Sequence, residues 1–202
     1  MDWPRFFEHL QIVATSIAFT ILCGLPVGVA AYLFSPARKI ILRVVDILQT
    51  IPSLALLGII MTFLGAGKVT VVTGLVLYSL LPVVTNTYVG LCGVAPGIKE
   101  AAVGMGMTKL HCLLRVELPI AFPIIFTGIR IATVTSVGSA VFAAYVGGGG
   151  LGSLIHRGIR IQSMPLILFG TLSLMFMAVV FDAGMGWIQK RLQAGPRSAG
   201  IL

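Results

Sequence analysis

Five stretches of this chain are long and apolar enough to cross a lipid bilayer as helices. A crossing helix needs about 20 apolar residues, and its backbone must hydrogen-bond internally because the bilayer core holds no water. Only 10% of the residues are charged, against about 25% in ordinary soluble domains. The sequence therefore predicts one all-α, polytopic membrane domain over residues 1–202, with spans at 10–34, 40–64, 69–91, 118–146 and 165–188.

The positive charges fall unevenly on the two sides of this predicted bundle. Alternate connections hold Arg38, Lys39, Arg43, Lys99, Lys109, Arg115, Lys190, Arg191 and Arg197, whereas the others hold Arg5, Lys68, Arg157 and Arg160. Because cytoplasmic loops are enriched in Lys and Arg, we expect the first group inside the cell, with the N-terminus outside and the C-terminus inside. The net charge of +8 does not indicate nucleic-acid binding, since the basic residues sit singly between apolar runs.

The connection over residues 97–119 is too polar to span a membrane and too apolar to be a slack linker. It reads GIKEAAVGMGMTKLHCLLRVELP, and its apolar residues after Gly106 recur at helical spacing. This pattern predicts a short helix, a turn permitted by Gly104 and Gly106, and a second helix along the membrane surface. We expect such a projection to dock into a groove on a soluble partner.

The spacing of residues in this connection resembles the EAA loop of ATP-binding cassette (ABC) importer permeases. The matching positions are Glu100, Ala101, Ala102, Gly106, Val116, Leu118 and Pro119, with Val116 in place of the usual isoleucine. In that family the loop forms the coupling helices that sit in a cleft of the ATP-binding subunit. The resemblance implies that Glu100, Ala101, Ala102, Gly104 and Gly106 form the contact with that subunit.

Three further segments resemble the osmoprotectant branch of these permeases, which imports glycine betaine, choline or carnitine. They are residues 46–58, residues 81–90 and the run GGGGLG at 147–152, although this run also occurs in methionine-type permeases. The resemblance implies a bacterial cytoplasmic (inner) membrane protein that moves a compatible solute or, alternatively, an amino acid such as methionine.

The same resemblance implies several partners. These are a dimer of ATP-binding subunits that holds ATP and Mg, a separate substrate-binding protein outside the membrane, and a second permease that is either identical or homologous. No cofactor is expected in this chain, because the sequence lacks the phosphate-binding G-x-x-x-x-G-K-[ST] motif.

Polar residues and prolines inside the spans predict where the transport path lies. Broken helices often line such paths, and proline frees a backbone carbonyl one turn earlier in a helix. The candidate pore or gate residues in the second and third spans are Asp46, Gln49, Pro52, Pro82 and Asn86.

Ionisable residues within spans are costly and need partners. Arg43 and Asp46 are three residues apart and are expected to pair on one helix face, either to stabilise membrane entry or at an inner gate. Arg130 lies deep in the fourth span, and we expect a structural ion pair with Asp182.

Two other classes of protein fit the sequence less well. An intramembrane enzyme would need a nucleophile beside a base, and the nearest approach is Ser153 and His156 in an outer connection. A stand-alone channel or carrier would not need the loop at residues 97–119. The sequence therefore favours an importer permease that performs no catalysis itself.

Overall fold

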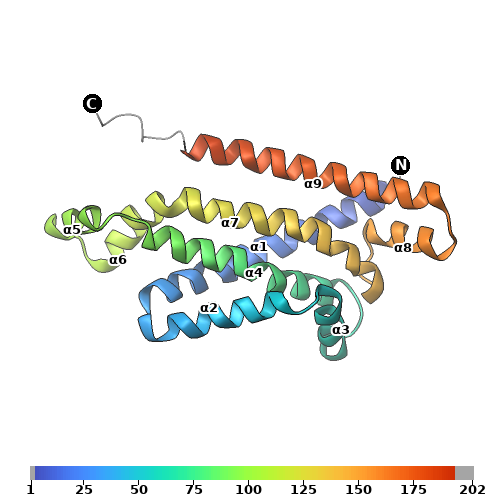
Figure 1. Cartoon of the computed structure of the whole chain (residues 1–202), viewed down its shortest axis with the longest axis horizontal. Helices are drawn as coiled ribbons and strands as arrows, with labels where there is room; N and C mark the ends of the chain where they lie inside the picture. Colours follow the sequence, from blue (N-terminus) through green and yellow to red (C-terminus); the bar gives the residue numbers. More distant parts are fainter. Residues whose placement is uncertain (1–2, 194–202) are drawn as a thin grey trace.

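Four long helices run side by side along the length of the molecule (Figure 1). The computed structural model describes residues 3–193, and over this range every regular element is helical. The long helices are α1 (Trp3–Leu33), α4 (Lys68–Cys92), α7 (Leu118–Ser139) and α9 (Met164–Gln193). All four spans, counted with the segments that continue them, are apolar and long enough to cross a membrane.

The second predicted span is not one continuous helix. It divides into α2 (Ser35–Thr50) and α3 (Ser53–Leu64), and the two axes differ by 101°. Proline cannot continue a helix and pushes the residue before it into an extended conformation, which Ile51 adopts with ψ 127° before Pro52. If the bent pair counts as one span, the described chain has five candidate spans.

Pro82, by contrast, does not break its helix, because α4 is helical on both sides of it. A serine near Pro82, Ser79, could cap the carbonyl that Pro82 frees. Its hydroxyl instead hydrogen-bonds to the Ser136 hydroxyl on α7 at 2.8 Å. The third span is therefore continuous, and the expectation of a second broken helix is wrong.

Shorter segments join the long helices at both ends of the bundle. They are α5 (Pro96–Gly104), α6 (Lys109–Cys112), η1 (Leu113–Glu117), η2 (Ala140–Val146) and α8 (Gly152–Arg160). The run Lys109–Val146 is helical over 38 residues, so the second helix of the 97–119 connection leads into the fourth span. It is not a separate helix, because the π-helical turn Leu113–Glu117 carries the chain directly into α7, whose start accommodates Pro119.

Glycines let the backbones of α1, α4 and α7 approach closely. A Cβ atom added at Gly28 of α1 would lie 2.6 Å from Cβ of Thr87, and one at Gly128 of α7 would lie 2.3 Å from the carbonyl oxygen of Pro82. Small residues serve this purpose in membrane bundles, where packing replaces the hydrophobic drive of soluble proteins. Helix α4 is therefore held between α1 and α7 at the centre of the fold.

The two ends of the bundle carry different connections (Figure 1). One end holds α5 and α6, the C-terminal end of α1 and the start of α2; the opposite end holds the start of α1, α3 and α8. The two predicted groups of basic residues thus lie on elements at opposite ends, apart from Arg197, which lies outside the described residues.

Candidate coupling surface and translocation groove

Helix α5 and the turn after it form a projection at one end of the molecule, which we call the tip (residues 96–110). Gly106 closes the turn with φ +83°, a conformation that side-chain-bearing residues rarely adopt. The amide of Met105 donates to the carbonyl of Ala101, and the amide of Met107 donates to that of Ala102. Local sequence therefore shapes the tip through the turn that glycine permits.

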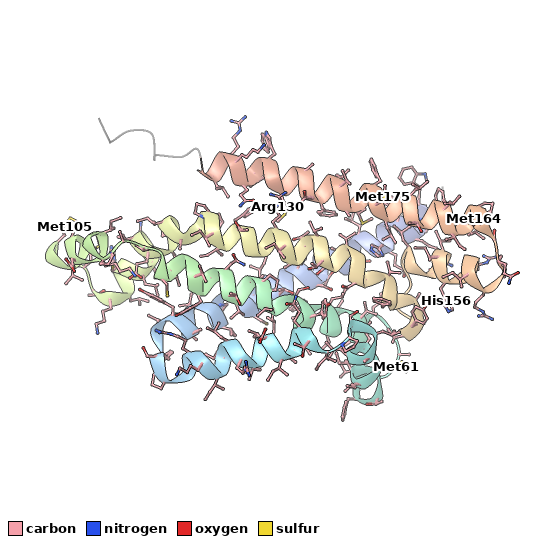
Figure 2. The ribbon with its side chains drawn as sticks, viewed as in Figure 1. Met61, Met105, Arg130, His156, Met164 and Met175 are labelled. Carbon is pink, nitrogen blue, oxygen red and sulfur yellow. The ribbon has the colours of Figure 1, made fainter. Side chains whose placement is uncertain are left out.

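Apolar side chains gather on the outer surface of the tip. Val103, Met105 and Leu110 are 60%, 71% and 65% exposed, and Met105 lies at the far end of the molecule (Figure 2). Glu100, Ala101 and Gly104 are also exposed. Such a surface, beyond the ends of the spans, is typical of a protein-interaction site.

Ala102 does not belong to this surface. It is only 2% exposed, because its face of α5 packs against the chain's own helices. The expectation that Ala102 contacts a partner directly is therefore corrected, and its small size instead lets α5 lie close to the bundle.

Four of the five candidate pore residues meet in one groove. Asp46 and Gln49 of α2 face Pro82 and Asn86 of α4 across a hollow of about 710 Å³. Pro52 does not line the groove and acts instead at the break between α2 and α3. The structure also adds lining residues that sequence patterns did not single out, namely Lys39, Leu42, Leu81, Thr85 and Ile131.

Arg43 and Asp46 both line this groove but form no ion pair within the described part of the chain. Both residues are exposed. A pair three residues apart on a helix contributes only about 0.2–0.5 kcal/mol, so spacing alone does not fix it. The predicted pair is thus absent, and both charges face the groove.

The structure brings Arg130 of α7 and Asp182 of α9 together. Two nitrogens of the guanidinium donate to the two carboxylate oxygens at 2.8 and 2.9 Å. Arg130 also donates to Gln189 at 3.1 Å, and Gln189 donates to Thr127 at 2.6 Å. Sequence reasoning missed Gln189, because a neutral amide in a span carries no charge signal.

At the opposite end of the bundle, the glycine run after η2 folds over the start of α1. The amide of Gly150 donates to Glu8 at 2.8 Å, and Lys68 pairs with the other carboxylate oxygen of Glu8 at 3.0 Å. A Cβ atom at Gly149, which has φ +80°, would lie 2.4 Å from the Glu8 carboxylate. The glycines therefore allow a close approach to Glu8, a residue that no motif had indicated.

Ser153 and His156 do not form a nucleophile–base pair. The Ser153 hydroxyl donates to the carbonyl of Gly150 at 2.6 Å, and the His156 ring packs edge-on against Tyr145 with 4.8 Å between centroids. No hydrogen bond joins the two side chains among residues 3–193. The arrangement offers no activated hydroxyl for hydrolysis.

Comparison with known families decides what this fold is. The model of the binding-protein-dependent transport system inner membrane component family matches residues 20–194. The chain belongs to this family.

Curated relatives cover most of this inner membrane component. It is 39% identical over 189 residues to the osmoprotectant import permease protein OsmY of Salmonella typhimurium, covering 92% of this chain and 79% of the relative. It is 36% identical over 189 residues to the glycine betaine/carnitine/choline transport system permease protein OpuCD of Bacillus subtilis, covering 93% and 82%.

Solved structures show the same architecture. A chain described under inward-facing conformations of the MetNI methionine ABC transporter superposes with a TM-score of 0.83 at 22% identity, covering 92% of this chain and 93% of that one. At this identity the likeness establishes the fold and not the substrate. This inner membrane component is accordingly a permease component of an ABC importer, and every regular element of residues 3–193 is helical.

Proposed function

We propose that the exposed tip is the surface through which a separate ATP-binding subunit drives this permease. The observation that carries the proposal is the combination of an EAA-type sequence with apolar side chains exposed beyond the spans. Val103 and Met105 would enter a cleft of the partner, with Glu100 and Ala101 at the contact. ATP and Mg would be bound by that partner, which hydrolyses ATP.

The groove between α2 and α4 is our candidate for this chain's share of the translocation path. It is open on one side, and six of its ten lining residues are polar or charged. We propose that a second permease, identical or homologous, closes the path over Asp46, Gln49 and Asn86. A substrate-binding protein would deliver the solute at the end that carries α8.

We also propose an orientation for the chain in the bacterial inner membrane. The tip and the ends of the helices that carry most of the Lys and Arg would face the cytoplasm, in agreement with the rule for cytoplasmic loops. The N-terminus would then lie outside and the C-terminus inside.

The substrate we propose is a small quaternary amine such as glycine betaine, choline or carnitine. The names of the relatives support this class.

Uptake in a deletion strain tests this proposal. Cells that lack the chain should lose uptake of radiolabelled choline, glycine betaine or carnitine, and the full chain should restore it. Methionine uptake in the same cells serves as the control. Loss of methionine uptake, or no defect for any quaternary amine, would contradict the substrate class.

A further inference from the structure

Side chains and a carbonyl from four helical segments converge where the tip joins the bundle. Tyr32 comes from the end of α1, Lys99 from α5, and Glu117 from η1, while Leu91 contributes its backbone carbonyl from the end of α4. We call this group the inner clasp. None of its side chains lines the groove or lies on the exposed apolar surface of the tip.

Direct polar contacts connect every member of the clasp. The Tyr32 hydroxyl donates to Glu117 at 2.5 Å and accepts a hydrogen bond from Lys99 at 2.8 Å. Lys99 also donates to the Leu91 carbonyl at 3.2 Å, and its ammonium lies 3.6 Å from the Glu117 carboxylate. The ammonium thus satisfies a carbonyl at the end of α4, where a helix favours positive charge.

The two charged side chains of the clasp are largely buried, so their contacts affect stability. The Glu117 side chain is only 10% exposed and that of Lys99 is 26% exposed. A buried charge is costly unless it is paired and hydrogen-bonded, so removal of one partner leaves the other uncompensated. The stability of each buried charge in the clasp therefore depends on the segments that supply its partners.

The charge on Lys99 persists at neutral pH. Burial alone lowers its pKa, but the hydrogen bond to Tyr32 and the negative charge of Glu117 outweigh burial, so the pKa is raised above its ordinary value of 10.5. The ammonium is therefore charged under physiological conditions, and the clasp is an ionic as well as a hydrogen-bonded connection.

We propose that Lys99, Tyr32 and Glu117 are positioning residues that fix the coupling helix α5 to α1, α4 and α7. This inference rests on the proposed function, in which an ATP-binding subunit displaces the tip. Because the clasp joins α5 to three spans at once, a displacement of α5 moves their ends together. Without the clasp, α5 can shift on its partner while the spans stay in place.

This role differs from that of the exposed tip. Glu100 and Val103 are exposed and would act in binding the partner, whereas the clasp side chains are covered by the chain itself. Loss of a tip contact should weaken assembly. Loss of a clasp contact should leave assembly intact but reduce the number of solute molecules moved per ATP hydrolysed.

The test uses the complete importer, reconstituted in liposomes with its ATP-binding subunit and binding protein. Lys99→Met and Glu117→Gln remove the ionic contact, and Tyr32→Phe removes only the bridging hydroxyl. Lys99→Arg keeps the charge. Arg115→Met is the matched control, since Arg115 is an exposed basic residue of the same connection that lies outside the tip.

We expect Lys99→Met and Glu117→Gln to lower the ratio of transport to ATP hydrolysis by about two- to thirtyfold, the range for residues that carry coupling between sites. Tyr32→Phe should lower it less, Lys99→Arg should restore part of it, and Arg115→Met should stay within about twofold of wild type. ATP hydrolysis and co-purification of the ATP-binding subunit should persist in every variant.

An unchanged ratio in both Lys99→Met and Tyr32→Phe would overturn the clasp, even if the importer assembles normally. So would a fall in transport and hydrolysis by the same factor, because it would indicate a general loss of active complex. Failure of the wild-type chain to co-purify with an ATP-binding subunit would instead refute the proposed function on which the clasp rests.

Discussion

Individual glycines in the tip have different tasks, although they are only two residues apart. Gly106 has φ +83°, whereas Gly104 is helical and a Cβ atom there would meet nothing within 4 Å. Backbone conformation thus constrains Gly106, whereas no neighbour among residues 3–193 constrains Gly104. We therefore attribute any requirement for glycine at position 104 to a partner.

Gly106→Ala should destabilise the turn by about 1 kcal/mol, because alanine is strained in a left-handed conformation. Gly104→Ala should leave the thermal stability of the detergent-purified chain unchanged. If Gly104→Ala nevertheless weakens co-purification of the ATP-binding subunit, the partner approaches the backbone at that point. Equal stability of the two variants would contradict the assigned turn.

The two acids of the spans should also respond differently to neutralisation. Asp182→Asn should lower the melting temperature, because it leaves the Arg130 guanidinium without its paired carboxylate. Asp46→Asn should leave it unchanged, since Asp46 pairs with no cation in the described chain, while it reduces solute uptake. A larger loss of stability from Asp46→Asn would contradict this assignment.

Pairs of residues could be predicted from the sequence where an unpaired charge inside the membrane would be energetically costly. They could not be predicted where sequence spacing alone suggested a pair. A cation as deep as Arg130 needs a counter-charge, which restricts the choice to very few residues such as Asp182. Arg43 and Asp46 sit near a polar groove, so no desolvation cost obliges them to pair. Clasp residues such as Tyr32 and Lys99 were unpredictable, because they are 67 positions apart.

At the scale of elements, the close approach of α7 to α4 depends on Gly128. An added Cβ atom there would lie 2.3 Å from the Pro82 carbonyl oxygen and 2.7 Å from Cβ of Asn86. Both of these neighbours belong to the helix that forms one side of the groove. Packing of α7 and the shape of the groove are therefore connected.

Gly128→Ala should destabilise the chain by about 1–3 kcal/mol, the usual cost of overpacking, and should also change uptake by shifting α4. Gly138→Ala is the matched control on the same helix, because a Cβ atom there meets nothing within 4 Å. Thermal unfolding in detergent and uptake in cells measure the two effects. Equal melting temperatures for both variants would refute the tight crossing.

The helix boundaries show which features of the fold can be predicted from apolar runs and prolines in the sequence. Long apolar runs indicated where the long helices lie, because the bilayer sets a minimum length, although α1 begins at Trp3 rather than at residue 10 and α9 ends at Gln193 rather than at residue 188. A break at Pro52 was expected, but its angle of 101° was not, since proline can either kink or end a helix. Pro82 allows the same two outcomes, and there the helix continues, because neighbouring helices hold α4 in register.

At the scale of the whole molecule, the tip, the inner clasp and the groove form a continuous mechanical path. The tip projects from one end of the molecule (Figure 1), the clasp joins it to three long helices, and the groove lies between α2 and α4. Family membership could be recognised from sequence because the EAA pattern is local. The clasp could not be predicted, because it assembles from residues far apart in the chain. The groove was predicted in part, since Asp46, Gln49, Pro82 and Asn86 were candidates and its other lining residues were not.

Site-specific photocrosslinking tests the central claim, that a separate ATP-binding subunit engages the tip. A photoreactive amino acid is placed at Val103 of α5 or, as the control, at Ile159 of α8; these residues are 60% and 54% exposed. The importer is irradiated in native membranes. We predict a covalent adduct with the ATP-binding subunit from position 103 and none from position 159. An adduct from position 159 alone, or from neither position, would contradict the account.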